Sequence, residues 1–428
     1  MKRKLISILI ALALVFTMTA CSGKETSKAS PQHPVVITDH VLDIGTITDF
    51  DEESFMKYYE NQLLVPNGGC SCILTQVDGN NLVGRNTDMG LSENAAFKFV
   101  LDINKYKAIG LSYSPGTPGL DYDNVLKNGV DENALNSIPY TASDYLNEKG
   151  LYIETNNRSY EEGLEVIGTN PDSDVNVFLA LFPAYAVTRC ATVDDVVELA
   201  KSVNIYNSID PSKAPVSNYA FMLADAQGNY GLLEVAGNKV AFLKGQNGHA
   251  NYYVTPEFAE NQKYASGESR YKVLNEGLGE VKTMDDMLEH MRKAHYSQAW
   301  AVKDLDKATF DVRSEFVNYI PVNDKGEVDM ENGDPANCTA AWLTDEGRRD
   351  EVFNLLQDIN KNDFGQCIKE DGTYDYDELR KAYGTMPDFW VSAFTIAVDC
   401  SQKTMKVRFW ENPDDIFEFS FYNSMHEN

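Results

Sequence analysis

Residues 69–88 read GCSCILTQVDGNNLVGRNTD, and the local physics of this stretch sets the centre of the fold. Two short apolar-rich segments, 72–77 and 81–85, are separated by an Asp-Gly pair at 78–79. Asp-Gly between two such segments is a strong signal for a tight turn. The stretch therefore predicts a β-hairpin.

The predicted hairpin gathers three chemically active side chains. Antiparallel pairing brings the start of one strand near the end of the next, so Arg85 and Asp88 can lie beside Cys70. Such a cysteine could be a nucleophile with its electrostatic support. It could equally be a buried structural cysteine followed by a surface arginine, because free Cys is among the most buried residue types. The hairpin alone leaves both interpretations open.

The N-terminus has the pattern of an export signal. A basic start at 2–4 precedes an apolar run at 5–16 that is too short to span a bilayer. The sequence MTAC at 18–21 resembles the lipobox of bacterial lipoproteins, whose cysteine is lipidated and becomes the first residue. We therefore expect a lipoprotein signal peptide at 1–20 and an extracytoplasmic protein that is lipid-anchored to the bacterial cell membrane at Cys21. An ordinary cleaved signal with secretion is the alternative.

Composition indicates a folded and strongly acidic protein. Residues 21–35, rich in Ser, Lys and Pro, have the pattern of a flexible tether. The remaining chain is long enough for one large domain or two smaller ones, and its 23 Tyr and 20 Phe favour a packed core. The net charge of −28 becomes −31 when the three basic residues at 2–4 leave with the signal (−28 − 3). This charge argues against nucleic acid as a partner and against a basic membrane-binding patch.

The cysteines give no metal signature. Of the seven, those after Cys21 are scattered, without a CxxC pair or a repeated spacing, which argues against a zinc site. Cys338 with Cys367 or Cys400 could form a disulfide outside the cell, and the sequence leaves this open. The chain has no glycine-rich phosphate loop and no HExxH motif. We expect neither a metal nor a cofactor.

Downstream of the hairpin the pattern predicts both strands and helices. Strands are expected at 151–156, 219–225, 230–235, 239–243, 250–255, 394–399 and 405–410, and helices at 192–203, 269–278, 283–293 and 350–359. Thr192 and Thr283 each precede an aspartate by three positions, which is typical of a capping box at a helix start. Strand-rich halves with helices grouped between them predict an α+β protein in which two sheets pack together and helices cover them.

Four motifs, in this order, resemble a known family. They are GCS…DG…GRNTD at 69–88, NEKGL at 147–151, an asparagine at a strand end and SRY at 269–271. Together they are similar to choloylglycine hydrolases and penicillin V acylases, which are cysteine members of the N-terminal-nucleophile (Ntn) hydrolases. Acid ceramidase shows a related opening motif. The resemblance covers 69–300 and 390–421, and it implies a four-layer αββα sandwich of two packed antiparallel sheets.

The resemblance also implies site residues. Matched position by position, the active-site residues of the family fall on Cys70, Arg85, Asp88, Asn157, Asn251 and Arg270. Cys70 matches the nucleophile, which in this family is the first residue of the mature chain, and Arg85 and Asp88 match the residues that support it. Asn157, ten residues on from the Asn of NEKGL, matches an oxyanion-hole asparagine. Asn251 matches a second asparagine of the family.

Three features depart from the family pattern. The interval from Cys70 to the first arginine is one residue short, which makes Cys72 a rival nucleophile, although the interval from Cys72 is three short and no glycine precedes it. Only 19 residues separate Asn251 from Arg270 (270 − 251), so the long loop that helps bile salt hydrolases form tetramers is missing, and we expect a monomer or dimer. The stretch 300–390 has the pattern of an insertion.

A terminal cysteine supplies both nucleophile and base. Its thiol attacks, and its α-amine, with a pKa of about 7.7–8.0, takes the proton, so no catalytic histidine is needed. Arg85 would favour the thiolate, Asp88 would accept a hydrogen bond from the α-amine, and Asn157 and Asn251 would donate to the oxyanion. A thioester then forms and water hydrolyses it. Each residue also has a purely structural interpretation, such as a turn cap or a stabilising ion pair.

This mechanism requires processing, because an internal Cys70 has no free amine. We expect cleavage at Gly69–Cys70, with 36–69 as a propeptide or small subunit and 70–428 as the Ntn-hydrolase catalytic domain. The expected function is a membrane-anchored amidohydrolase that cleaves a linear amide of a small N-acyl substrate, of the bile salt, penicillin V or N-acyl amino acid type. The alternatives are an acyltransferase on the same fold and a lipoprotein that only binds ligands.

Overall fold

The computed structural model describes residues 34–38, 41–49, 68–90, 96–113, 122–130, 135, 138–139, 142–158, 164–207, 218–262, 268–294, 296–299, 316–319, 389–409 and 412–421. The expected signal peptide, Cys21, nearly all of the tether and of the 300–390 insertion, and the expected helix at 350–359 lie outside these residues. Within the described parts, no helix is both long enough and apolar enough to cross a membrane.

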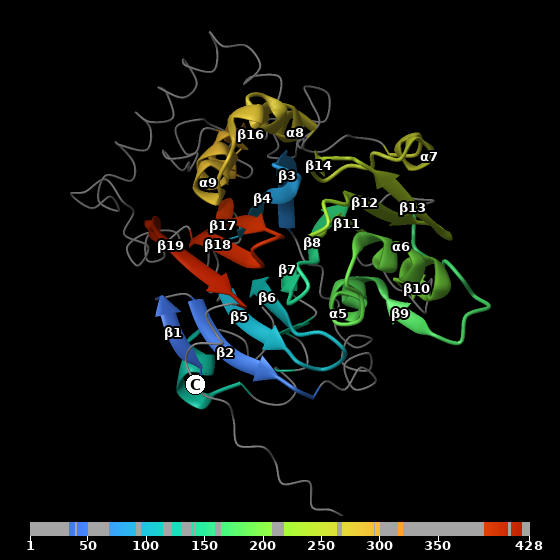
Figure 1. Cartoon of the computed structure of the whole chain (residues 1–428), viewed down its shortest axis with the longest axis horizontal. Coiled ribbons are helices and arrows are strands. Elements are labelled where there is room, and N and C mark those ends of the chain that lie inside the picture. The colour runs from blue at the N-terminus through green and yellow to red at the C-terminus, as the bar shows by residue number, and fades with distance from the viewer. Residues whose placement is uncertain are drawn as a thin grey trace, which may run out of the picture.

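One sheet has nine described strands (Figure 1). In spatial order they are β1 (Val35–Thr38), β2 (Val41–Ile47), β5 (Ala96–Leu101), β6 (Ala108–Tyr113), β7 (Ala142–Asn147), β8 (Tyr152–Arg158), β11 (Asn218–Ala224), β12 (Tyr230–Ala236) and β13 (Lys239–Lys244). Strands β2 and β5 run parallel, and the other described neighbours in this sheet run antiparallel.

The second sheet has eight described strands and carries the predicted hairpin. In order they are β14 (Gly248–His249), β3 (Gly68–Val77), β4 (Asn80–Gly90), β17 (Phe389–Asp399), β15 (Tyr296–Ala299) and β16 (Phe316–Tyr319), with β18 (Thr404–Phe409) and β19 (Asn412–Ser420) joined through β17. Strand β17 pairs with β4 from end to end and so attaches the C-terminal part of the chain to the hairpin. A separate small sheet pairs β9 (Asn176–Phe178) with β10 (Asn204–Tyr206).

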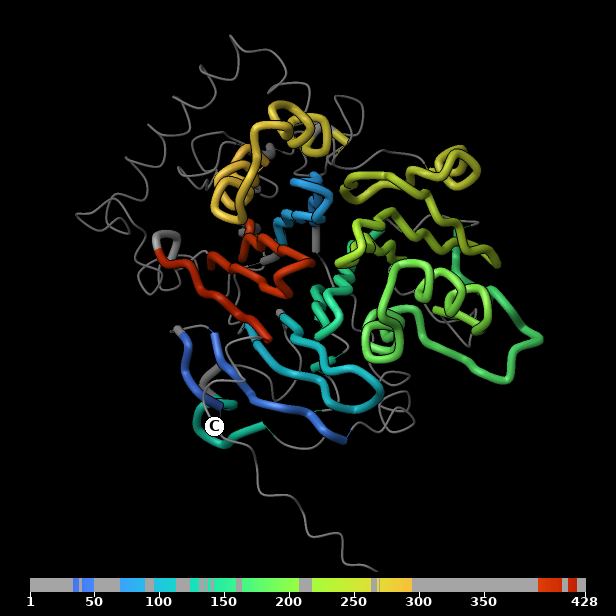
Figure 2. Tube along the Cα trace, viewed as in Figure 1, coloured from blue at the N-terminus to red at the C-terminus, as the bar shows by residue number. Residues whose placement is uncertain are grey.

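Helices cover the outer faces of the two large sheets (Figures 1 and 2). On one side lie α5 (Phe182–Val187) and α6 (Val193–Ser202), and on the other lie α8 (Glu268–Asn275) and α9 (Met284–Met291). The other helical segments are α3 (Tyr122–Asn128), α7 (Pro256–Ala259) and 3₁₀ turns at 179–181, 278–280 and 292–294.

Three hydrophobic clusters fill the three interfaces between these layers. The first packs α5 and α6 against residues of the nine-stranded sheet such as Phe221. The second lies between the sheets, where Leu74 shares a cluster with Met222. The third packs Met287 and its neighbours on α8 and α9 against residues of the eight-stranded sheet such as Ile73. The order helix, sheet, sheet, helix confirms the expected αββα sandwich.

The hairpin forms as its sequence predicts. Asp78 and Gly79 have φ values of 51° and 83°, the positive values that a tight two-residue turn requires at both positions. The register pairs Cys70 with Thr87 and Cys72 with Arg85. Because side chains alternate along a strand, the two cysteines face the other sheet while the residue between them faces away.

The strand predicted at 250–255 does not form. Only Gly248–His249 pairs, with β3, and the chain beyond it is irregular. Its backbone donors go to side chains instead: the Glu234 carboxylate accepts from the N–H groups of Val254 (2.9 Å) and Thr255 (2.7 Å), and the Gln262 side chain accepts from Tyr253 (2.8 Å). Asn251 therefore lies on an irregular segment rather than on a strand.

The segment that precedes Cys70 is built into the nine-stranded sheet. Strand β2 pairs in parallel with β5, and β1 pairs with β2 at the edge. Leu42, Ile44 and Ile47 are at most 3% exposed and belong to the large cluster under α5 and α6. Part of the core thus comes from residues on the N-terminal side of Cys70.

Candidate active site

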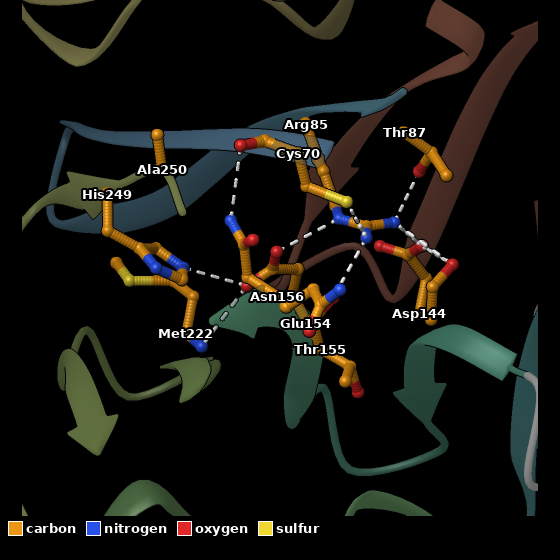
Figure 3. A network of polar contacts seen from close by, with 12 residues as sticks. Cys70, Arg85, Thr87, Asp144, Glu154, Thr155, Asn156, Met222, His249 and Ala250 are labelled. Carbon is orange, nitrogen blue, oxygen red and sulfur yellow. Dashed lines mark hydrogen bonds and ion pairs between the residues drawn. The ribbon is translucent and has the colours of Figure 1, made fainter. Parts of the chain in front are cut away.

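The thiol of Cys70 lies against the guanidinium of Arg85. The Arg85 Nη2 donates to Cys70 Sγ at 2.9 Å, and both residues are at most 5% exposed (Figure 3). The hairpin register explains the contact, because Arg85 is opposite Cys72 and its long side chain reaches back along the same face. The structure therefore brings together the cysteine and the arginine that the sequence predicted to be neighbours.

Arg85 is held by groups of the opposite sheet. Its Nη1 pairs with the Asp144 carboxylate on β7, and its Nε donates to Glu154 Oε1 on β8 at 3.0 Å. The Thr155 carbonyl accepts from Nη2 at 2.9 Å, and the Thr87 hydroxyl accepts from Nη1. Since an arginine fork has few rotamers that satisfy so many acceptors, the guanidinium is fixed against the sulfur.

Burial keeps the thiol protonated in the intact chain. Desolvation raises the pKa of Cys70 to about 12, and Arg85 opposes this rise without cancelling it. The carboxylates of Glu154 and Asp88 add to the rise. A thiol in this state attacks only slowly, and a base beside the sulfur would accelerate the attack.

A second set of contacts fixes the backbone nitrogen of Cys70. This nitrogen donates to Asn251 Oδ1 at 3.0 Å, and Arg270 Nη2 donates to the same oxygen at 2.7 Å. Arg270 also pairs with Asp88, whose other oxygen accepts from the Ser392 hydroxyl at 2.6 Å. Asp88 was expected to accept a hydrogen bond from the free α-amine of a processed Cys70. In the intact chain its carboxylate pairs with Arg270, which shares the Asn251 oxygen with the Cys70 nitrogen, and the contact with a free amine stays a prediction.

The asparagine whose side chain lies beside Cys70 is Asn156. Its Nδ2 donates to the Cys70 carbonyl at 3.3 Å and its Oδ1 accepts from Asn251 Nδ2 at 2.8 Å. The predicted residue, Asn157, offers its backbone carbonyl to Asn251 at 2.9 Å. Strand alternation places the Asn157 side chain on the opposite face of β8 from that of Asn156. The structure therefore brings the Asn156 side chain and the Asn157 backbone to the candidate site, and the assignment of the oxyanion donor to Asn157 stays a prediction.

Cys72 is a poor rival for the role of nucleophile. It is 0% exposed and belongs to the cluster between the sheets, and burial raises its pKa well above the ordinary value. The nearby Glu154 carboxylate raises this pKa further, whereas Arg85 directs its Nη2 to the Cys70 sulfur.

The sequence did not predict a group formed by Cys72, Glu154 and His249. Their thiol, carboxylate and imidazole atoms lie within 4.8 Å of one another, but the residues come from three separate strands, so no spacing reveals them. The chemistry does not suit a cation, because Arg85 already binds Glu154 and Arg158 already binds His249. Two guanidinium groups at hydrogen-bond distance would repel a metal ion.

The sequence from residue 70 to residue 299, more than half of the chain, matches the family model for linear amide C–N hydrolases, choloylglycine hydrolase family. The match begins at Cys70. Two solved structures of conjugated bile acid hydrolase from Clostridium perfringens, a mutant and a variant, are each 14% identical, with 83% of this chain and 93% of theirs covered and a TM-score of 0.41. Penicillin V acylase from Agrobacterium tumefaciens is 12% identical, with 82% and 86% covered and a TM-score of 0.38. No curated protein matches.

Proposed function

Because the chain belongs to the choloylglycine hydrolase family of linear amide C–N hydrolases, we propose that it hydrolyses a small N-acyl amide through a thioester on Cys70. The observation that carries this proposal is the 2.9 Å contact between Cys70 Sγ and Arg85 Nη2, at the residue where the family match begins. The substrate class is an acyl group joined to a small amine, as in a conjugated bile salt, penicillin V or an N-acyl amino acid.

The reaction uses the α-amine of a terminal Cys70 as its base. The amine takes the thiol proton, Arg85 stabilises the thiolate, and the sulfur attacks the amide carbon. The amide groups of Asn156 and Asn251 lie beside Cys70 and supply neutral donors for the oxyanion. The C–N bond then breaks, the leaving amine takes the proton from the α-ammonium, and an acyl thioester remains. Water, deprotonated by the same amine, hydrolyses the thioester to the acid and restores the thiol.

The proposal includes a self-cleavage step that creates the amine. The Cys70 sulfur attacks the Gly69 carbonyl, the Gly69–Cys70 peptide bond breaks, and the freed nitrogen takes up the proton of the thiol. Water then hydrolyses the resulting thioester and leaves a carboxylate on Gly69. In the intact chain the Cys70 nitrogen already donates to Asn251 Oδ1, an acceptor that suits the new ammonium equally well.

After cleavage, residues 36–69 stay bound as a small subunit. Strand β2 remains paired with β5 and keeps Leu42, Ile44 and Ile47 in the core. Each fully buried side chain of this size contributes about 1.5–3 kcal/mol. Lipidation at Cys21 would then anchor the small subunit to the cell membrane and hold the catalytic part there without a covalent link. A Cys21→Ala chain should accordingly leave the membrane fraction.

A panel of amides tests the function. The chain beginning at Ser22 is incubated with a conjugated bile salt, penicillin V and an N-acyl amino acid, and mass spectrometry follows the released acid and amine. We expect release from at least one class, loss of release in Cys70→Ala, and retention in Cys72→Ala, the matched control. Release that survives in Cys70→Ala, or no release from any class, would overturn the proposal. Adding a primary amine to the reaction separates hydrolysis from acyl transfer.

A further inference from the structure

Four buried polar side chains form a continuous chain beside the candidate active site. His249 Nε2 lies 2.9 Å from Glu154 Oε2, and His249 Nδ1 lies 2.7 Å from Arg158 Nη2. Arg158 Nη2 also contacts Glu234 Oε1 at 3.4 Å. All four residues are at most 1% exposed, and none belongs to the motifs that identified the family. We call these four residues the clamp.

One end of the clamp holds Arg85. Glu154 binds Arg85 Nε with Oε1 and His249 with Oε2, so both of its oxygens are engaged (Figure 3). The second oxygen also accepts from the backbone N–H of Met222 at 3.3 Å. The orientation of the guanidinium against Cys70 therefore depends on His249, although His249 itself does not contact the sulfur in any described hydrogen bond.

The other end of the clamp holds the segment that carries Asn251. Arg158 Nη1 donates to the Ala250 carbonyl at 2.5 Å, one residue before Asn251. The Glu234 carboxylate accepts from the N–H groups at 254 and 255, just after it. Arg158 is two residues from Asn156 along β8, and His249 is two residues from Asn251. The contact between Arg158 and His249 thus ties together the two segments that bear the candidate oxyanion donors.

The hydrogen bonds define the protonation state of His249. An arginine can only donate, so Nδ1 of His249 must accept from Arg158 and carry no proton. The remaining proton is on Nε2 and is donated to Glu154, so the imidazole is neutral. Burial lowers the pKa of His249, and the Arg158 guanidinium lowers it further against the opposing effect of Glu154.

A second proton on the imidazole would break the clamp. It would place the Nδ1–H against an Arg158 N–H at 2.7 Å, where two donors repel each other. The groups that face His249 are Glu154 and Arg158 from β8, Glu234 from β12 and the Cys72 thiol from β3. With both ring nitrogens already committed, acidification removes the Arg158–His249 contact from the set that joins the two asparagine-bearing segments.

We propose that Glu154, His249, Arg158 and Glu234 are positioning residues for the reaction at Cys70, and that the clamp holds only while His249 is neutral. The kinetic part of this inference rests on the proposed function. Its predicted consequence is a second fall in turnover at acidic pH, beyond the one that protonation of the Cys70 α-amine causes, and this second fall belongs to His249, a residue outside the set that the family resemblance supplies.

Two substitutions at His249 separate positioning from folding. In His249→Gln the amide can accept from Arg158 and donate to Glu154 but cannot titrate, whereas His249→Leu loses both contacts. We expect His249→Leu to lower kcat by on the order of 10²-fold with a smaller change in KM. Protonation of the Cys70 α-amine already lowers turnover on acidification, and protonation of His249 should add a second fall at more acidic pH. We expect His249→Gln to keep kcat within about 5-fold and to lose only this second fall. His290→Gln, at a buried histidine that contacts the Leu274 carbonyl, is the matched control and should keep both falls.

The tautomer of His249 gives a readout that needs no activity. In the ¹⁵N spectrum of the imidazole in the Cys70→Ala chain, we expect a bare Nδ1 and a protonated Nε2 at neutral pH. A proton on Nδ1 at neutral pH would overturn the inference, as would a pH profile of turnover that is the same in His249→Gln as in the parent. A parent chain that hydrolyses none of the amides would reject the proposed function, while the spectrum would still decide on the clamp.

Discussion

The two sheets contribute different things to the candidate site. The eight-stranded sheet provides the reactive groups, Cys70 and Arg85, from one short hairpin. The nine-stranded sheet provides the groups that orient them, among which are Asp144 and Glu154. Reactive groups gathered by a hairpin need only local pairing, whereas their orientation depends on the way the two sheets pack. Substitutions on the orienting side should therefore impair chemistry without touching the thiol.

The largest effect is expected at the junction of the sheets, in Arg85→Met. This change leaves the Asp144 and Glu154 carboxylates buried without their cation, and breaking a buried pair costs about 3–5 kcal/mol of stability. Urea unfolding in the uncleaved Cys70→Ala background measures the loss. Arg85→Lys keeps the charge but not the fork, so it should recover part of the stability and little of the turnover. A loss under 1 kcal/mol, within the range of an exposed pair, would show that the sheets are not joined through this residue.

The next effect distinguishes the two faces of β8. Asn156→Ala removes the amide that faces Cys70, and loss of one oxyanion donor typically raises the barrier by about 2.7–4 kcal/mol, or 10²–10³-fold in kcat. Asn157→Ala, one residue on and on the other face, should lower kcat by less than about 10-fold. Steady-state kinetics on the two purified variants measures both. A larger loss in Asn157→Ala would reverse the assignment.

A smaller effect is expected in the dependence of stability on pH. The pKa of His249 in the folded chain lies below its ordinary value of 6.5, because burial disfavours the charged ring. Below pH 6.5 the unfolded chain therefore binds a proton that the folded chain does not, and stability falls by up to about 1.4 kcal/mol per pH unit until the folded pKa is reached. Unfolding curves from pH 7 to pH 5 should show a shallower fall in His249→Gln. An equal slope in the two chains would mean that His249 does not titrate below its ordinary range.

The smallest effect is expected in a control variant that changes only the stability of the fold. Thr192 caps α6, far from the thiol, with both hydrogen bonds of a capping box present. Thr192→Ala should cost about 1 kcal/mol, seen as a lower Tm, with kcat/KM unchanged. If kcat/KM fell as far as in Asn156→Ala, the effect of the latter would be one of general stability and not of the amide.

The parts that the sequence predicted are those governed by neighbouring residues. The turn at Asp78 and Gly79 and the helix starts at Thr192 and Thr283 follow from side chains within three positions of one another, and the structure shows all of them. The apolar pattern also predicted several strands of each sheet, such as those at 219–225 and 394–399, but not the neighbouring strands at 96–101, 108–113 and 142–147. The αββα arrangement itself came from the family resemblance, because patterning indicated two covered sheets but not their order.

The parts that the sequence missed depend on distant residues. The strand expected at 250–255 is absent because Glu234, about 20 residues away, takes two of its backbone donors. Glu154 and His249 are separated by 95 residues, so no spacing motif connects them. Counting from a motif reached the right end of β8, but it could not tell that the side chain beside Cys70 belongs to Asn156, since a shift of one residue reverses the direction of a strand side chain.

The central claim is that Cys70 becomes the first residue of an active chain, and intact mass tests it most directly. The chain beginning at Ser22 is purified and measured under denaturing conditions. We expect two species whose masses sum to that of the chain plus one water, with the larger species starting at Cys70. A single uncleaved species that hydrolyses an amide, or a cleaved species starting at Cys72, would contradict it.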